Sequence, residues 1–194
     1  MLDDSAATLE TTAAVRDGQA SPPAAYANDA GSAPAASRPA RIESSSARES
    51  RTAQAGEQTP IQPRDATVLV VEDNVSNFVL VARMLAYMGV PRCEWKTSGW
   101  QVVEYADILP RVDLILMDLR LPYEDGYTAL HKIRSSPRLK DTIVVAVTAE
   151  ANEGQLVKAR ESGFDGFLGK PLDPDRFPEQ IRRLLHGDPV WEAS

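Results

Sequence analysis

The chain has 194 residues and a formal net charge of −7 at pH 7. This acidic balance lacks the basic footprint that nonspecific binding to nucleic acid or to an anionic membrane requires, so we expect neither partner. Cys93 is the single cysteine, which excludes a disulfide framework and a cysteine-based metal cluster. No apolar run approaches the roughly 18 residues that span a bilayer, and the acidic N-terminus lacks the apolar region of a secretory signal. We therefore expect a cytoplasmic protein.

The first 64 residues differ in composition from the rest of the chain. They contain 16 alanines, 8 serines and 6 of the 14 prolines, but only six residues of the types Val, Ile, Leu, Met, Phe and Trp. Such a segment cannot bury enough apolar surface to offset the entropy cost of ordering its backbone. We therefore predict a disordered tail over residues 1–64, which is either an inert extension or a tether that binds a partner. A folded domain is predicted over residues 65–187, followed by a short C-terminal tail over 188–194.

Short apolar runs alternate with segments of helical periodicity from residue 66 onward. Strands are predicted over residues 66–72, 93–97, 112–117, 143–148 and 164–169. Helices are predicted over residues 75–89, 100–109, 126–136, 152–162 and 178–186. Glycine or proline follows most of these helices, and Asp173 is a candidate N-cap for the last one.

The five β–α repeats predict an α/β domain. Near-continuous apolar strands that alternate with amphipathic helices indicate a doubly wound parallel five-stranded sheet with helices on both faces. Right-handed crossover connections leave few topologies for such a chain. Ligands of these sheets bind at the carboxyl ends of the strands, which is where we look for functional residues.

Five polar residues stand at the predicted carboxyl ends of four strands. Glu72 and Asp73 follow the first strand, and Asp118 follows the third. Thr148 ends the fourth strand, and Lys170 follows the fifth. Three carboxylates, one hydroxyl and one ammonium are therefore expected at one edge of the sheet.

These residue types predict a phosphoryl site. Clustered carboxylates repel each other, and a divalent cation with oxygen ligands such as Mg²⁺ removes the conflict. A metal and Lys170 aimed at Asp118 suit the negative charge of a phosphoryl group, so Asp118 is interpreted as a nucleophile that becomes an aspartyl phosphate. Taken singly, an aspartate or asparagine after a strand is more commonly a helix N-cap, a reading that Asp73 and Asn74 also allow. The joint placement of all five residues favours the functional interpretation.

Four sequence motifs resemble the receiver domain of bacterial response regulators. They are VLVVEDN, LILMDLRLPYEDG, VAVTAEA and GFLGKP, in that order. The spacings are similar to those of the family, with 45 residues from Asp73 to Asp118, 30 to Thr148 and 22 more to Lys170. The resemblance covers about residues 66–187 and implies the flavodoxin-like (βα)5 fold. The EDNxxN start is similar to receivers of hybrid kinases and of stand-alone phosphorelay proteins.

The resemblance implies a role for each acidic residue. Asp118 would be the phosphoacceptor. Asp73 would coordinate Mg²⁺ directly, Glu72 would do so through a water, and the backbone carbonyl of Arg120 would be a further protein ligand. Asp125 is interpreted instead as the N-cap of the helix that follows.

The resemblance also implies a switch. Thr148 and Lys170 would contact the phosphoryl oxygens, and Phe167 matches the family's aromatic switch position. The Lys170–Pro171 peptide bond would be cis. One departure is Leu121, where the family often has methionine before the proline.

The predicted function is a single-domain response regulator rather than an enzyme. A histidine kinase or a histidine phosphotransfer protein would donate the phosphoryl group, and an unknown protein would read the output, with a possible homodimer through the last helix. Arg120 and Glu150 are expected to pair at the mouth of the site. One alternative is a Mg²⁺-dependent phosphatase of the haloacid-dehalogenase type, although that family has a second aspartate where this chain has Arg120. The other alternative is an interaction module that never takes phosphate.

Overall fold

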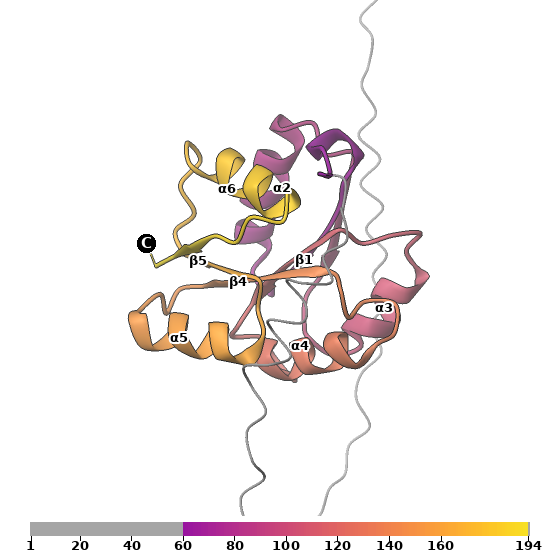
Figure 1. Ribbon diagram of the computed structural model, residues 1–194, viewed down its shortest axis with the longest axis vertical. Coiled ribbons are helices and arrows are strands. Elements are labelled where there is room, and N and C mark those ends of the chain that lie inside the picture. Colours follow the sequence, from indigo (N-terminus) through magenta and orange to yellow (C-terminus); the bar gives the residue numbers. More distant parts are fainter. Residues whose placement is uncertain (1–59, 194) are drawn as a thin grey trace, which may run out of the picture. The chain divides into compact units, whose positions relative to one another are not determined.

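The computed structural model describes residues 60–193, which form an α/β domain built on one parallel sheet (Figure 1). Most of the predicted tail, residues 1–59, lies outside the described residues. Within the described part, six strands are hydrogen-bonded in the order β2-β1-β3-β4-β5-β6. The strands are β1 (Thr67–Val71), β2 (Arg92–Lys96), β3 (Leu114–Asp118), β4 (Ile143–Thr148), β5 (Gly166–Gly169) and β6 (Trp191–Glu192).

Helices cover both faces of the sheet, as the alternating pattern predicts. The helices of the described chain are α2 (Val75–Tyr87), α3 (Val102–Ile108), α4 (Gly126–Ser135), α5 (Glu153–Ser162) and α6 (Phe177–Leu185), preceded by a 3-10 turn, η1 (Pro63–Asp65). Helices α2 and α6 lie on one face, and α3, α4 and α5 lie on the other (Figure 1). No helix within residues 60–193 has the length and apolar character needed to cross a membrane.

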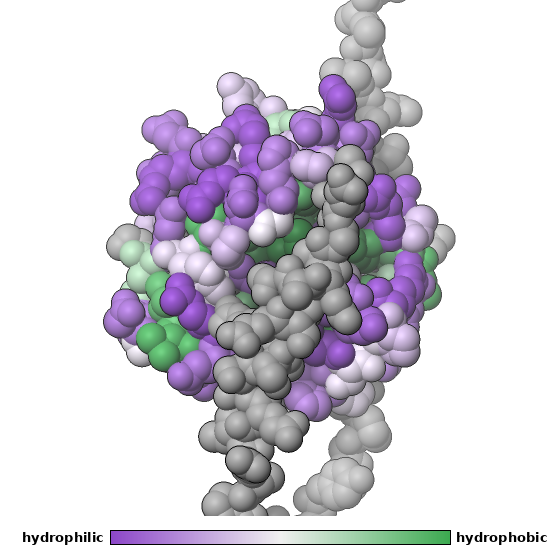
Figure 2. Space-filling model, in the orientation of Figure 1, coloured by the Kyte–Doolittle hydropathy of each residue, from purple (hydrophilic) through white to green (hydrophobic). Residues whose placement is uncertain are grey.

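Alternate residues of each central strand enter two separate hydrophobic layers. In β1, Val68 and Val70 pack in the layer beneath α2 and α6, whereas Leu69 and Val71 pack in the layer beneath α3, α4 and α5. Successive side chains of a strand point to opposite faces, so a strand that is covered on both sides must be apolar at every position. This requirement explains the continuous apolar runs of β1, β3 and β4. Outside these layers, the face shown in Figure 2 is mostly hydrophilic over α6 and α2.

Side-chain caps fix where several helices begin. Asn74 caps α2 by accepting hydrogen bonds from two backbone N–H groups, and Asp125 caps α4 in the same way. The prediction for Asp173 is wrong, because α6 begins later and its N-cap is Arg176. The Asp173 carboxylate instead accepts a hydrogen bond from the Asp175 N–H, at 2.9 Å, in the turn that precedes the helix.

The strand order switches direction between β1 and β3, and ligands of open parallel sheets bind at the carboxyl ends of the strands at such a point. The chain leaves β1 toward β2 at the edge of the sheet and then returns to β3 on the other side of β1. The two connections therefore run in opposite directions across the sheet.

The C-terminal segment adds a strand that the sequence prediction did not include. Residues Trp191–Glu192 pair in parallel with β5, so the sheet has six strands in the described chain rather than the predicted five. At the other end, the Ile61 N–H donates to the Leu185 carbonyl at 3.2 Å, and the Ile61 side chain packs against the α2/α6 layer. Both predicted boundary segments therefore contribute contacts to the domain.

Candidate functional site

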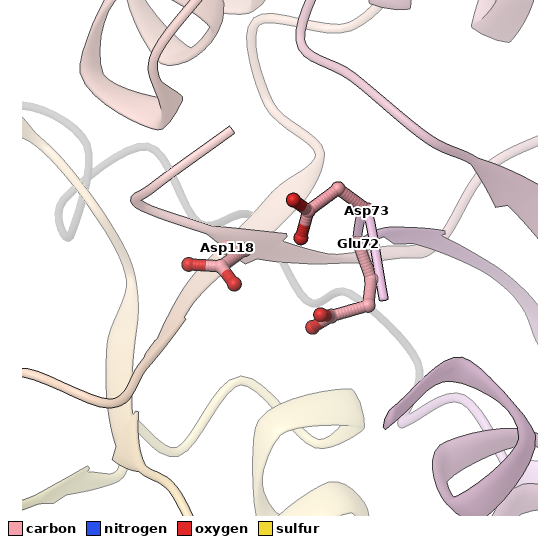
Figure 3. Close-up of side chains that lie close together, drawn as sticks. All are labelled: Glu72, Asp73 and Asp118. Carbon is pink, nitrogen blue, oxygen red and sulfur yellow. The ribbon is translucent and has the colours of Figure 1, made fainter. Parts of the chain in front are cut away.

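Three carboxylates lie together at the carboxyl ends of β1 and β3. Glu72 and Asp73 directly follow β1, and Asp118 is the last residue of β3. Their side chains lie close together (Figure 3), and one oxygen from each lies within 4.8 Å of the others. The predicted acidic cluster is therefore formed by the fold.

Lys170 enters the same cluster from the end of β5. Its Nζ atom lies 2.6 Å from Oε2 of Glu72 and 2.6 Å from Oδ2 of Asp118. The Lys170 backbone N–H donates to the Thr148 carbonyl at 2.8 Å, which fixes the chain just beyond the strand. The Lys170–Pro171 bond is cis, as expected. One ammonium thus bridges carboxylates that belong to two other strands.

Burial and charge act in opposite directions on these groups. Burial raises the pKa of Asp118, and the neighbouring charge of Glu72 adds to this, while Lys170 and the Arg120 N–H lower it without cancelling the rise. Burial by itself lowers the pKa of Lys170, but its hydrogen bonds to Asp118 and Glu72 outweigh burial, so the pKa is raised. The ammonium therefore stays charged between its two partners.

Asn77 and Trp95 form a brace behind Glu72, with one hydrogen bond to its side chain and one to its backbone. The Asn77 side-chain amide donates to Oε1 of Glu72 at 2.9 Å. The indole N–H of Trp95, on β2, donates to the Glu72 backbone carbonyl at 2.8 Å. The Trp95 ring stacks on Phe78 of α2 with centroids 4.5 Å apart. Asn77 is the second asparagine of the EDNxxN motif, whereas no residue pattern in the sequence points to Trp95, because its contact is with the backbone.

Gly126 lets the loop after β3 close tightly over the strand end. A Cβ atom at this position would lie 2.5 Å from the Asp118 carbonyl oxygen and 3.0 Å from the Leu119 Cα. Both neighbours are backbone atoms that cannot move aside independently. A side chain at this position would therefore displace the strand end that carries Asp118.

Thr148 and Arg120 complete the rim. Thr148 is buried at the end of β4, and its Oγ1 atom accepts a hydrogen bond from the Glu150 N–H at 3.2 Å. The Arg120 N–H donates to Oδ1 of Asp118 at 2.8 Å. As expected, the Arg120 guanidinium pairs with the Glu150 carboxylate. Phe167 is wholly buried in β5.

Comparison with known proteins assigns the family. The family model described as "Response regulator receiver domain" matches residues 68–182. The chain belongs to the response regulator receiver family. A receiver is a phospho-accepting signalling module rather than a classical enzyme, so the phosphatase alternative is set aside.

Relatives of this receiver include parts of hybrid kinases and short regulators. It is 38% identical over 124 residues to the signal transduction histidine-protein kinase BarA of Escherichia coli, covering 64% of this chain but only 13% of BarA. It is 31% identical over 119 residues to the polar-differentiation response regulator DivK of Brucella anthropi, covering 61% of this chain and 95% of DivK. The receiver therefore spans a small part of the kinase relatives and nearly all of the short one.

A solved structure shows the same fold with a metal. The receiver domain of sensor histidine kinase PA1611 from Pseudomonas aeruginosa, with a magnesium ion coordinated in the active site cleft, is 32% identical. It aligns with a TM-score of 0.56 over 62% of this chain and 97% of that domain.

The residues of this receiver fit a divalent cation. Glu72, Asp73 and Asp118 offer oxygen atoms only, which is the donor set that Mg²⁺ prefers. When ionised, three carboxylates beside one ammonium leave an uncompensated negative charge that a divalent cation would neutralise. Asp73 is exposed, whereas Glu72 and Asp118 are buried, so the cluster is open to solvent on the Asp73 side. The acidic pocket is thus consistent with Mg²⁺-dependent phosphorylation of an aspartate.

Proposed function

We propose that this receiver accepts a phosphoryl group on Asp118 from the phosphohistidine of a histidine kinase or of a histidine phosphotransfer protein. The observation that carries the proposal is the placement of Asp118, which shares the Lys170 ammonium with Glu72 at 2.6 Å on each side. A nucleophilic carboxylate needs positive charge beside it to receive a negatively charged phosphoryl group, and Lys170 supplies that charge.

The transfer exchanges one bond to phosphorus for another. A carboxylate oxygen of Asp118 bonds to phosphorus, and the bond from phosphorus to the imidazole nitrogen breaks. The electron pair of that bond stays on the nitrogen. Lys170 then faces the phosphoryl oxygens. The Thr148 oxygen accepts the Glu150 N–H in this structure. The hydroxyl hydrogen can therefore be donated to one of the phosphoryl oxygens.

The acidic residues would hold Mg²⁺. Asp73 and Asp118 would bind it directly, Glu72 through a water, and the Arg120 carbonyl would be a further ligand. When bound, the ion neutralises charge on the carboxylates and on the phosphoryl oxygens. These metal-binding roles are supported by the carboxylate oxygens of the cluster and by the family of the chain.

The phosphoryl group would then change an interaction face. Its charge of roughly −2 draws the Thr148 hydroxyl toward Asp118, and Phe167 follows into the vacated space. Phe167 lies on β5 between α5 and α6, so the surface built by these three elements is the one that changes. The downstream partner would be a protein that binds one state of this surface more tightly than the other.

The proposed function also bears on the domain bounds, the location and the partners of the protein. We place the body of the receiver domain at residues 65–187, against which Ile61 and β6 pack, and its site of action in the cytoplasm, where histidine kinases present their phosphohistidine. A homodimer would use the solvent-facing side of α6, the last helix, because the apolar side of this helix packs in the core. The net charge of −7 favours protein partners over nucleic acid or membrane.

Mass spectrometry of the intact protein tests the proposal. Acetyl phosphate with Mg²⁺ should add one phosphoryl group to the wild-type chain. The adduct should be missing from Asp118→Asn and from wild type in excess chelator. An equal adduct on Asp118→Asn, or one that forms without divalent cation, would refute the assignment.

A further inference from the structure

The C-terminal segment is held to the sheet by its backbone. In the parallel pairing of β5 with β6, Phe167 is the partner of Trp191 and Leu168 is the partner of Glu192. The Phe167 N–H donates to the Val190 carbonyl at 2.7 Å. Without β6, β5 would be the edge strand and would present unpaired backbone groups.

Side chains from α5, from α6 and from its N-cap residue contact the same segment. The guanidinium of Arg160, on α5, lies 4.6 Å from the centroid of the Trp191 ring, within the range of a cation–π contact. The Glu192 carboxylate contacts the Arg176 guanidinium and accepts a hydrogen bond at 2.7 Å from the Gln180 side chain. Figure 1 shows the yellow C-terminal strand between α5 and α6. The Trp191 ring is thus contacted by Arg160 of α5, and the Glu192 carboxylate is contacted from the α6 side.

The β5 edge is shaped to take a strand at close range. A Cβ atom on Gly166 would lie 2.8 Å from the Val190 carbonyl oxygen and 3.0 Å from a Leu184 methyl carbon. The missing side chain is what allows the incoming backbone to approach. A hydrogen-bonding edge, a glycine and two arginines on opposite sides therefore form a site for an extended peptide.

We infer that the β5 edge is a strand-accepting interaction surface, that β6 is its built-in ligand, and that the protein partner of this surface inserts an extended segment carrying an aromatic residue followed by a carboxylate. Strand addition supplies affinity through the backbone, while side-chain pockets select the sequence. Arg160 and Arg176 would select the partner by the same contacts that they now make with Trp191 and Glu192. This inference rests on the proposed function for its regulation but not for the binding chemistry.

Phosphorylation would loosen the built-in ligand. Phe167 provides the amide that binds the Val190 carbonyl, and the Phe167 side chain lies in the same hydrophobic layer against which Trp191 packs. A strand displacement at Phe167 lengthens this hydrogen bond and disturbs the packing of Trp191. The phosphorylated form therefore holds β6 less tightly, and the edge becomes available to a partner.

Hydrogen exchange on the full chain tests the regulation. Backbone amides of residues 190–193 should exchange at least fivefold faster after treatment with acetyl phosphate and Mg²⁺, and the same treatment should leave Asp118→Asn unchanged. Intact mass is recorded on each sample. Unchanged exchange in a sample that carries the adduct overturns the coupling while the proposed function stands; a wild-type chain without adduct overturns the proposed function itself.

Peptide binding tests the surface independently of phosphorylation. The probe is a fluorescent peptide with the sequence of residues 188–193, capped at both ends, and the control peptide has alanine in place of tryptophan. The full chain with Trp191→Ala, or with Glu192→Lys, should bind the probe at least fivefold more tightly than wild type, because its own strand competes less. Adding Arg160→Ala to either variant should remove most of that gain. The surface assignment is overturned if folded variants bind the probe no better than wild type, or bind both peptides equally.

Discussion

A buried lysine between two carboxylates and an exposed ion pair lie at the same edge of the sheet, and they differ mainly in burial. Inside the site, Lys170 bridges Glu72 and Asp118, and its side chain is only 14% exposed. At the mouth, Arg120 pairs with Glu150, and the Arg120 side chain is 70% exposed. Removing one partner of a buried pair typically costs about 3–5 kcal/mol, whereas an exposed pair contributes about 0–1 kcal/mol. The interior pair should therefore control stability and chemistry, and the outer pair should only tune them.

Removal of the interior ammonium should have the largest effect. In Lys170→Met, Glu72 and Asp118 remain buried and repel each other without a cation. The free energy of unfolding at pH 7, measured by urea titration without divalent cations, should fall by about 2–3 kcal/mol, slightly below the fully buried range. Lys140→Met, which changes an exposed lysine, is the matched control and should stay within about 0.5 kcal/mol of wild type.

The same variant should show a defect that depends on pH. Burial already raises the pKa of Asp118, and loss of Lys170 removes a contact that lowers it. A carboxyl group with a raised folded-state pKa favours folding when protonated, so its penalty is present at high pH and declines as pH falls through that pKa. The gap between Lys170→Met and wild type should therefore narrow on acidification. A gap that stays constant or widens would contradict the buried-pair interpretation.

A side chain at Gly126 should have the next largest effect. Gly126→Ala forces a Cβ atom against the Asp118 carbonyl and the Leu119 Cα. Overpacking of this kind costs about 1–3 kcal/mol, and phosphorylation by acetyl phosphate should slow because the strand end shifts. Gly154→Ala in α5 is the control, since its nearest atom is the Asn152 Oδ1 at 3.3 Å. If both variants phosphorylate at the wild-type rate, the close approach is not needed.

Loss of the brace behind Glu72 should have a moderate effect. Trp95→Phe keeps an aromatic ring to stack on Phe78 but removes the hydrogen bond to the Glu72 carbonyl. A hydrogen bond of about 1 kcal/mol corresponds to roughly fivefold weaker Mg²⁺ binding, measured by calorimetric titration. Trp100→Phe, away from this brace, should bind Mg²⁺ as wild type does. Equal affinity in the two variants would show that Trp95 is only a packing residue.

The mouth pair should have the smallest effect. Arg120→Ala and Glu150→Ala should each speed loss of the phosphoryl group by at most about fivefold, because an exposed pair contributes at most about 1 kcal/mol. The double variant should add little beyond either single change. Phosphate release from the phosphorylated protein gives the rate. Decay at or below the wild-type rate in both single variants would show that the pair does not shield the site.

The sequence predicted the arrangement of the site better than its supports. Apolar runs placed Glu72, Asp118, Thr148 and Lys170 at strand ends, and parallel topology brings such ends together. The second contact of Lys170, to Glu72, was not predicted, because strand order sets neighbours but not which carboxylate a flexible side chain reaches. The contact of Trp95 was missed because its acceptor is a backbone carbonyl.

Strand β6 and the start of α6 were predicted less well for a related reason. Strand β6 has two residues, too few to show any periodicity, and its partners Arg160 and Arg176 look like ordinary surface arginines in the sequence. Asp173 followed the pattern of an N-cap, but the chain makes a turn first and α6 begins at Phe177. Short segments like these take their structure from tertiary contacts rather than from local pattern.

Direct mapping of the phosphoryl group tests the central claim most sharply. The phosphorylated wild-type chain is treated with borohydride, which reduces an aspartyl phosphate to homoserine, and the product is sequenced by tandem mass spectrometry. Homoserine should appear at position 118 alone, and it should be missing from a sample kept in chelator. Homoserine at position 73 or at any other aspartate, with Asp118 intact, would contradict the account.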